Sequence, residues 1–470
     1  MIGVRTASQT IAAFAADFDH SRLGAEHLRQ CGRALADTIA VGIAGLREPS
    51  VGQVLHYLEN LGPGLAKHGE GNPSATARLW GAGRVASVEG AALFNGISAH
   101  VLDFDDASSP MSGHPSVALL PALVALAEAR DLSGLRLASA YVVGFEICCK
   151  FGRALDIGHY TKGWHMTSSV GTIAATAACG HLLGLDAGPI AHAIGLAVSQ
   201  TGGTRQNFGT DAKSFQAGQC NAAALRATLL AEQGLTASLH ALDGKAGYTA
   251  LYSSGEDISA AMAKLGVGRL EIEGSGIEVK KYPACYGIHR PLDGILALKQ
   301  THDLSPENVE GIEVTTSYGA LSPLIRHAPS SGIEGKFSMQ YALAAAIADG
   351  DVRLASFTDA AVDRSGLRWL MDRIVAREAS AEMLPRWAII KVRLKSGDVI
   401  ERRIDELHGS PHSPLSDAEL LAKISDCIAW SQRPIDPSSL LSAAMNLGVF
   451  GVRALLTAAE RQVDNNNRVQ

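Results

Sequence analysis

The chain has 470 residues, a formal net charge of −6, and a composition that is 47% hydrophobic but only 5% aromatic. This length exceeds what one compact core usually supports, so we expect two domains. The chain has no basic block that would release counterions from a nucleic acid, so we expect no nucleic-acid partner.

The seven cysteines are scattered and form no CxxC pair. They favour buried thiols in a reducing compartment over disulfides or a zinc knuckle. No segment approaches the ~18 apolar residues of a membrane span, and the amino terminus lacks a basic region followed by an apolar one. We therefore expect a cytoplasmic protein with no membrane partner.

Apolar residues at helical spacing fill the first half of the chain, between short polar turns. The pattern predicts helices over Leu23 to Ala44, Ser116 to Ala129, Leu135 to Leu155, Gly171 to Leu183 and Ile190 to Val198. Since Ala and Gly are abundant, we expect these helices to pack closely into one helical domain.

The pattern changes near Gly274, where glycine and proline interrupt the chain and strands begin to appear. The predicted elements are a helix over Arg290 to Gln300, a strand over Val309 to Tyr318, a helix over Met339 to Ala348, and strands over Trp387 to Leu394 and Val399 to Ile404. A hairpin turn with glycine at Gly397 joins the last two strands. Residues 275–404 are thus predicted to form a separate α/β module.

Ser416 and Glu419 then form a capping box that opens a helix to Trp430, and a last helix is predicted over Ser438 to Ala459. Only the tail 463–470 is predicted to be disordered. The expected fold is mostly α. A large all-helical domain built from both chain ends, residues 1–274 and 405–470, carries a smaller inserted α/β (α+β) lid domain, residues 275–404.

The richest chemistry lies in His100-Val-Leu-Asp103-Phe-Asp105-Asp106, which is followed by His114-Pro-Ser at the start of a predicted helix. Three carboxylates in four residues repel one another unless a cation or a proton offsets them. The cluster is therefore either functional or an ordinary helix end with solvated aspartates. A histidine at the exposed start of a helix can exchange protons near neutrality, which favours the functional interpretation.

A second loop, from Gly158 to Thr167, carries His159 and His165. His165 precedes a helix of small residues whose free N–H groups can hold an anion, so a carboxylate ligand is favoured. Zinc is the alternative. No third ligand stands at metal spacing, so we expect no metal site.

Lys213 follows QNFGTDA, and Lys280 opens KKYPACYGIH at the predicted domain junction. Lysines alone usually mean solvated surface, but two lysine motifs beside glycine, proline and histidine favour a clamp for a di- or trianionic substrate. Cys285, four residues before His289, is either a nucleophile or a packed small residue.

Two motifs resemble sites of other protein classes. Gly81-Ala-Gly83-Arg-Val-Ala86 matches a dinucleotide fingerprint but lacks the βαβ setting that this fingerprint requires. The aspartates at 103, 105 and 106 are similar to the magnesium motif of helical terpenoid synthases, but no second such motif follows.

Taken together, HVLDFDD, GHPSVALLPALVALAEA, GWHMTS, KKYPACYGIH and SPLSDAELLAKISDC resemble the MmgE/PrpD family over nearly the whole chain. The family contains 2-methylcitrate dehydratases, cis-aconitate decarboxylases and iminodisuccinate epimerases. The resemblance implies a helical domain from both chain ends, an inserted α/β lid, a homodimer, a pocket between the domains, and no metal or organic cofactor.

The resemblance also implies site residues. Its motifs place the catalytic group at Asp103, His114, His165 and Tyr318, with Tyr318 as a lid tyrosine. Substrate-binding positions fall on Lys213 and Lys280, and His159, Cys285 and His289 complete our predicted substrate-binding set.

Two positions depart from the decarboxylases, which carry threonine where this chain has Ala107 and histidine where it has Cys285. Decarboxylation is therefore not expected. The motifs Met111-Ser-Gly113-His114, GHYTKGWH and QNFGT look closest to the iminodisuccinate epimerases, while dehydration is the most frequent activity of the family. We expect a hydro-lyase similar to 2-methylcitrate dehydratase, acting on a small polycarboxylate, with iminodisuccinate-type epimerisation as the alternative. Both reactions begin by removing a proton next to a carboxylate. A non-catalytic protein that binds a carboxylate is a further alternative.

Overall fold

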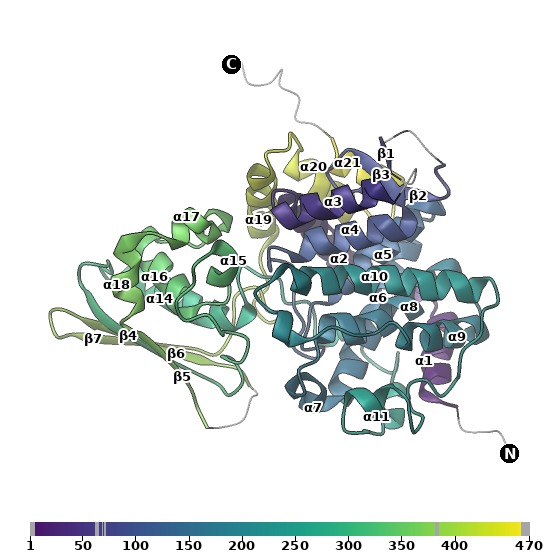
Figure 1. Cartoon of the computed structure of the whole chain (residues 1–470), viewed down its shortest axis with the longest axis horizontal. Helices are drawn as coiled ribbons and strands as arrows, with labels where there is room; N and C mark the ends of the chain where they lie inside the picture. Colours follow the sequence, from purple (N-terminus) through teal and green to yellow (C-terminus); the bar gives the residue numbers. More distant parts are fainter. Residues whose placement is uncertain (1–4, 62–64, 68, 70–71, 381–384, 462–470) are drawn as a thin grey trace.

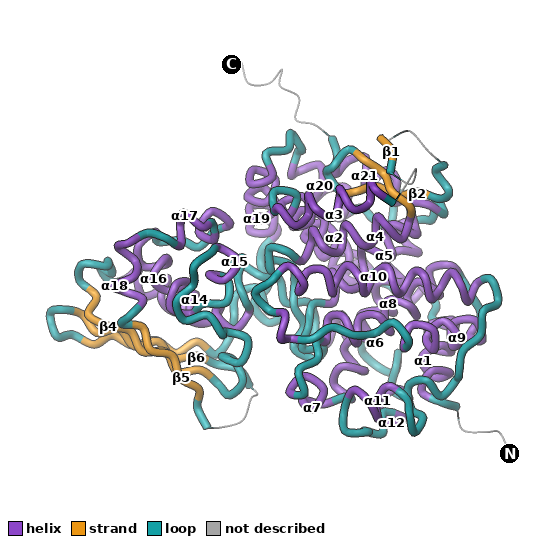
Figure 2. Tube along the Cα trace, viewed as in Figure 1, coloured by secondary structure: helices purple, strands orange, loops and turns teal. Residues whose placement is uncertain are grey.

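The computed structural model describes residues 5–61, 65–67, 69, 72–380 and 385–461 of the chain. It has two lobes, a larger one made mainly of helices and a smaller one in which helices cover a sheet (Figure 1). Most strands belong to the smaller lobe (Figure 2). The expected mostly helical fold is confirmed.

Helices with small, apolar side chains form the centre of the larger lobe, where they pack against one another. These helices are α4 (Val88–His100), α5 (Pro115–Ala129), α6 (Gly134–Ala154), α8 (Met166–Leu183) and α10 (Asp211–Glu232). All of α5 is buried, and apart from Ser116 and Glu128 its residues are apolar on every side, which is typical of a central helix.

Helices from both ends of the chain surround this centre. They are α1 (Ala7–Asp17), α2 (Ala25–Gly45), α3 (Pro49–Asn60) and α9 (Ala187–Val198), followed after the smaller lobe by α19 (Asp417–Ser431), α20 (Pro437–Met445) and α21 (Val452–Ala459). Helices α19 and α20 pack on α2, and α21 packs on α5. The carboxyl-terminal helices thus return to the first lobe, as predicted.

Short elements connect the large helices. They are α7 (Asp156–Thr161), α11 (Tyr248–Tyr252), α12 (Ser259–Met262), α13 (Glu271–Gly274) and the strands β1 (Ala66–Lys67), β2 (Thr76–Leu79) and β3 (Arg84–Ser87). Among the described residues, no helix combines the length and the apolar character needed to cross a bilayer.

The smaller lobe is built on a four-stranded sheet of order β5-β4-β6-β7, in which only β5 runs parallel to its neighbour. Its strands are β4 (Val309–Thr316), β5 (Ile374–Glu378), β6 (Ala388–Leu394) and β7 (Val399–Ile404). Buried residues alternate along β6, and this period of two gives the sheet one packed face. The helices of this lobe are α14 (His289–Thr301), α15 (Gly332–Gly335), α16 (Met339–Asp349), α17 (Asp359–Val362) and α18 (Ser365–Met371).

Each lobe has its own hydrophobic core. One core gathers residues between Ala7 and Val279 and between Leu415 and Leu456, and the other gathers residues between Tyr282 and Val392. This division agrees with an inserted smaller domain, while the boundaries at 274/275 and 404/405 stay predictions.

The structure contains elements that differ from the sequence prediction. Helices α1 and α3 and the small sheet β1-β3-β2 were not expected, so the larger lobe is not all-helical. The helix predicted over 438–459 is two helices, because the turn between them contains Gly448 and Gly451. The rejection of the dinucleotide fingerprint agrees with the structure, because Gly81 and Gly83, both with positive φ, form the hairpin turn between antiparallel β2 and β3. The tail 463–470 lies outside the described residues.

The crossing of α4 and α10 allows a stability test. A Cβ on Gly96 would lie 2.8 Å from the Gly218 Cα, and one on Gly218 would overlap the Leu93 carbonyl oxygen. Because backbone cannot move aside cheaply, Gly218→Ala should lower the free energy of unfolding by about 1–3 kcal/mol. Denaturant unfolding followed by circular dichroism would measure the loss.

Gly188→Ala is the matched control, since a Cβ there meets nothing within 4 Å and the residue lies in helix α9. It should be neutral or stabilising by about 0.5–1 kcal/mol. Equal unfolding midpoints for the two variants would contradict the close packing of α4 on α10.

Candidate functional site

The loop after α4 is held by lysines from three distant parts of the chain. It passes through Asp103 in the left-handed conformation, with φ 51°. Three consecutive carbonyl oxygens each accept a hydrogen bond from a different ammonium group. The pairs are Leu102 O with Lys336 Nζ at 2.8 Å, Asp103 O with Lys280 Nζ at 2.8 Å, and Phe104 O with Lys423 Nζ at 2.9 Å. The loop is therefore held by Lys336 of the smaller lobe, by Lys280 of the segment that joins the lobes, and by Lys423 of helix α19.

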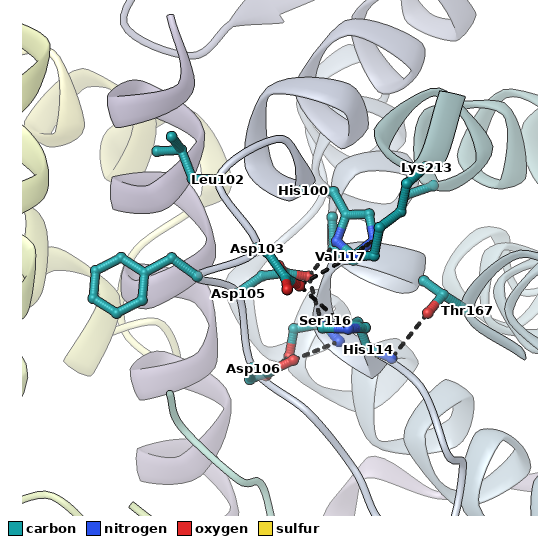
Figure 3. A network of polar contacts seen from close by, with 12 residues as sticks. His100, Leu102, Asp103, Asp105, Asp106, His114, Ser116, Val117, Thr167 and Lys213 are labelled. Atoms are coloured by element: carbon teal, nitrogen blue, oxygen red, sulfur yellow. Dashed lines mark hydrogen bonds and ion pairs between the residues drawn. The ribbon is translucent and has the colours of Figure 1, made fainter. Parts of the chain in front are cut away.

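The Asp103 carboxylate is buried and carries two ion pairs. Its Oδ1 lies 2.9 Å from Lys213 Nζ and 2.8 Å from Lys280 Nζ. Burial acts to raise the pKa of Asp103, but the two ammonium groups outweigh it and hold that pKa well below the usual 3.8. Asp103 is thus an anion between two cations. Figure 3 shows it beside Lys213 and the other aspartates of the cluster.

Asp105 joins two histidine rings. Its Oδ2 lies 2.8 Å from His100 Nδ1 and 3.1 Å from His114 Nδ1. Burial opposes ionisation of Asp105, yet the two rings hold its pKa well below 3.8. Lys213 Nζ donates to His100 Nε2 at 3.0 Å, so the proton of His100 lies on Nδ1 and points to Asp105. Burial lowers the pKa of His100 to about 4, which keeps the ring neutral.

The third aspartate of the cluster, Asp106, is protonated instead. Burial, supported by the charges of Asp37 and Asp105, raises its pKa to about 8, and it contacts the Ser116 hydroxyl and backbone N–H. The repulsion expected in this cluster is thus relieved by cations at Asp103, by histidines at Asp105 and by a proton at Asp106. All three are buried, which rules out a solvated helix end.

His114 and His165 occupy the same structural position in two helices, the N-cap of α5 and of α8. His114 Nε2 lies 3.8 Å from Asp103 Oδ1, on the side of the ring opposite Asp105. Both rings pack against the His100 ring, with centroids 4.7 Å and 5.8 Å away. The two histidines therefore share one wall of the site.

The tautomer of His165 follows from Gln216. The Gln216 amide nitrogen donates to Thr204 O at 3.2 Å, so its Oε1 faces His165 Nδ1 at 2.7 Å and accepts the proton there. His165 Nε2 is buried and has no hydrogen-bond partner among the described residues. Burial, together with the charges of His100, Lys213 and His114, holds the pKa of His165 well below 6.5. The ring thus presents a free lone pair.

A cavity opens over these groups and is lined by residues of both lobes. The wall from the larger lobe includes Asp103, Ser108, His114, Tyr160, His165, Phe208 and Lys213. The facing wall, from the smaller lobe, includes Cys285, Tyr286, Ala320, Phe337 and Arg386, while Glu278 and Lys280 come from the segment that joins the lobes. Carboxylates, cations and two imidazoles thus surround one space.

Six of the predicted site residues line this cavity, namely Asp103, His114, His165, Lys213, Lys280 and Cys285. The other three do not. His159 lies behind it, with Nε2 2.7 Å from Ser169 Oγ and Nδ1 3.0 Å from Tyr252 O. The ring of His289 faces the Ala284 carbonyl at 3.1 Å, and Tyr318 is 55% exposed, although its neighbour Gly319 lines the cavity.

The chemistry of Cys285 is that of a neutral thiol. Burial, followed by the charge of Asp103, raises its pKa to about 11, and His289 binds a carbonyl instead of the sulfur. A thiolate nucleophile is therefore not prepared at this position.

Sequence reasoning did not select five residues that the structure brings to the site, namely His100, Gln216, Lys336, Arg386 and Lys423. His100 stands in the motif that drew attention to the aspartates, and its burial at the end of α4 was the missing information. The others are single polar residues in ordinary helix or loop sequence, and only the fold brings Gln216, Lys336 and Lys423 to their partners and Arg386 to the cavity.

His100, Asp105 and His114 are the described residues whose ligand atoms lie close enough to hold a metal ion, all within 4.8 Å. Their contacts of 2.8 Å and 3.1 Å are hydrogen-bond distances, shorter than the ~3.3 Å that separates ligands about 2.0 Å from a tetrahedral metal. An ammonium group also lies 3.0 Å from His100 Nε2. The arrangement therefore suits proton transfer better than metal binding.

Replacing Lys336 tests whether the lysine-bound loop positions the site. Lys336→Met removes the donor to Leu102 O, which should let Asp103 shift and lower kcat by about tenfold to a hundredfold. Lys299→Met is the matched control, since Lys299 also donates to two carbonyls of the smaller lobe, those of Leu304 and Ile347, away from the cavity. Steady-state kinetics would show unchanged kcat for the control, whereas equal losses in both would point to general destabilisation.

Comparison with known proteins agrees with this architecture. The model of the MmgE/PrpD N-terminal domain matches residues 9–261, and that of the MmgE/PrpD C-terminal domain matches residues 282–434. Cis-aconitate decarboxylase of Mus musculus is 29% identical over 84% of this chain and 81% of its own length. The Homo sapiens cis-aconitate decarboxylase is 28% identical, over 85% and 83%. The cis-aconitate decarboxylase-like protein oryM of Aspergillus oryzae is 26% identical, over 86% of each chain. Both halves of the sequence thus match one family, and the chain belongs to the MmgE/PrpD family.

Proposed function

We propose that this protein is a cofactor-independent hydro-lyase for a small polycarboxylate, similar to a 2-methylcitrate dehydratase. It would remove a proton from a carbon next to a carboxylate and expel hydroxide from the adjacent carbon. The observation that carries the proposal is the buried, unpartnered Nε2 of His165, which offers a lone pair beside two ammonium groups.

His165 would serve as the base. Burial, followed by the charges of His100, Lys213 and His114, lowers the pKa of His165 and makes it a weak base in the free protein. A bound polyanion would oppose the charge part of this shift and so raise the basicity of the ring. Gln216 keeps the other ring nitrogen protonated, so the proton from carbon goes to Nε2.

Lys213 and Lys280 would stabilise the carboxylate as it gains charge. Each ammonium has three N–H donors, and two are already used: Lys213 on Asp103 and His100, and Lys280 on the Asp103 carbonyl and carboxylate. One donor of each remains for the substrate. Preorganised donors of this kind stabilise charge without reorganisation during the reaction.

His114 would be the acid that protonates the departing hydroxyl. Asp105 holds its Nδ1, and its Nε2 faces the cavity wall at Asp103. Because His114 and His165 lie on the same wall, they can take and give protons on the same side of a substrate. This favours elimination over epimerisation, which needs a proton donor on the opposite face.

Decarboxylation is the second candidate, because the relatives named above are cis-aconitate decarboxylases. Ala107 and Cys285, the two positions that depart from the decarboxylase pattern, both line the cavity. The two substitutions relative to the decarboxylase pattern therefore lie at the surface that would contact the substrate, and for this reason dehydration stays our first choice. Epimerisation and carboxylate binding without turnover are outcomes of the same test, and the homodimer stays a prediction.

Proton NMR of the EDTA-treated protein in deuterated buffer would test the proposal, using 2-methylcitrate, citrate, cis-aconitate and iminodisuccinate. New vinyl signals from 2-methylcitrate or citrate, with no loss of carbon, would support a dehydratase. Formation of carbon dioxide with itaconate would indicate a decarboxylase, and deuterium wash-in without an alkene an epimerase. Line broadening without turnover of any compound would indicate a binding protein.

His165→Gln should reduce kcat by about two to four decades, the usual scale for a lost acid or base, without unfolding the protein. His192→Gln is the control, because His192 binds the Ala237 carbonyl, remote from the cavity. Near-normal turnover of His165→Gln would remove His165 from the mechanism.

The pH dependence of kcat/KM follows from the lowered pKa of His165. A base is inactive once protonated, so lowering its pKa below 6.5 keeps the active neutral form present at lower pH. We expect the fall of kcat/KM on the acid side to lie below pH 6.5. A fall centred above pH 6.5 that disappears in His165→Gln would contradict this assignment.

A further inference from the structure

Lys213, Lys280 and Arg386 line the cavity but differ in the hydrogen bonds that they form. On the wall from the larger lobe and at the inter-lobe segment, Lys213 and Lys280 each keep one donor after binding Asp103 and its neighbours. Both ammonium groups lie next to the same oxygen, Asp103 Oδ1, so their remaining donors can bind one substrate carboxylate together. A polycarboxylate brings at least one more anionic group, which needs a partner elsewhere.

Arg386 stands on the facing wall, two residues before strand β6. Its guanidinium forms no hydrogen bond or ion pair with another described residue, although it lines the cavity. The nearby Arg290 differs, because its Nε donates to the Asp405 carbonyl at 3.3 Å and it does not line the cavity.

The cavity lining also contains a carboxylate, Glu278, which accepts a hydrogen bond from the backbone. Glu278 Oε1 accepts the Ser109 N–H at 2.8 Å. Burial and then Glu278 raise the pKa of Tyr286 well above 10, so that phenol stays neutral. Burial likewise raises the pKa of Tyr160, across the cavity. Arg386 thus lies beside the neutral phenols of Tyr286 and Tyr160, without an ion pair to another residue that the structure describes.

We propose that Arg386 is a specificity-determining residue that binds the substrate carboxylate farthest from the reacting carbon. This inference rests on the proposed function, because it presumes that the reacting carboxylate binds at Lys213 and Lys280. A planar guanidinium binds a carboxylate through two parallel hydrogen bonds, which fixes orientation as well as charge. The substrate would span the cavity from the lysines to Arg386, so polycarboxylates are selected over monocarboxylates.

Binding of tricarballylate, a tricarboxylate without a hydroxyl to eliminate, separates recognition from turnover. Isothermal titration calorimetry would compare the wild type with Arg386→Gln, Arg386→Lys and the control Arg290→Gln. Arg386→Gln should weaken binding by about tenfold to a hundredfold, the scale of a lost charge-assisted pair. Arg386→Lys should fall between, since it keeps the charge and loses the fork, and Arg290→Gln should match the wild type.

A second ligand locates the effect. Butyrate, which has one carboxylate, should bind the wild type and Arg386→Gln with equal affinity in an NMR titration. With the substrate that turns over, Arg386→Gln should raise KM more than it lowers kcat.

Unchanged tricarballylate affinity in Arg386→Gln, beside normal wild-type binding, would overturn the role of Arg386 and leave the proposed function standing. Absence of tricarballylate binding to the wild type would overturn the polycarboxylate substrate class itself. Equal weakening in Arg290→Gln would show a general change of surface charge and overturn the specific pairing.

Discussion

A buried carboxylate in the middle of the protein, Asp103, sets the main constraint on this structure. Removing an anion from water is costly unless cations and hydrogen bonds replace the lost hydration. Here Lys213 comes from α10 and Lys280 from the segment between the lobes. Lys336 and Lys423 bind the carbonyls on either side. The larger lobe, the smaller lobe and the carboxyl-terminal helices are therefore all tied to one short loop.

The same arrangement explains the electrostatics of the cavity. Burial first, and then the charges of His100, Lys213 and His114, keep the His165 ring neutral, so Lys213 acts on both Asp103 and His165. A polycarboxylate would thus have two effects, since it would fill the cavity and also increase the basicity of the group that attacks it. Proton abstraction would then be coupled to correct binding without any moving part.

The sequence was most informative where a pattern is local. Helical periodicity, the Ser416–Glu419 capping box and the hairpin turn at Gly397 all have short-range causes, and the structure has them as predicted. The family motifs placed six residues at one cavity, because each motif lies at a helix start or loop that the fold turns inward.

What the sequence could not provide depends on long-range contacts. The sequence around His159 and Tyr318 predicted a role in the site, yet the His159 ring contacts Ser169 and Tyr318 is exposed. Lys336 and Arg386 lie in unremarkable sequence and acquire meaning only from the loop or cavity beside them. The protonation of Asp106 was also beyond the sequence, since the three aspartates look alike there and differ only in their buried partners.

The contact between Lys423 and the Phe104 carbonyl joins residues 319 positions apart, and Lys423 also pairs with the buried carboxylate of Asp37. During translation, the loop that contains Asp103 is synthesised early and Lys423 is synthesised late. During most of synthesis, the nascent chain therefore holds Asp37 and the loop without this partner, and an unpaired buried charge is strongly unfavourable. The larger lobe therefore gains these two contacts only after the carboxyl-terminal helices have been synthesised, so a chain that ends before Lys423 would lack them.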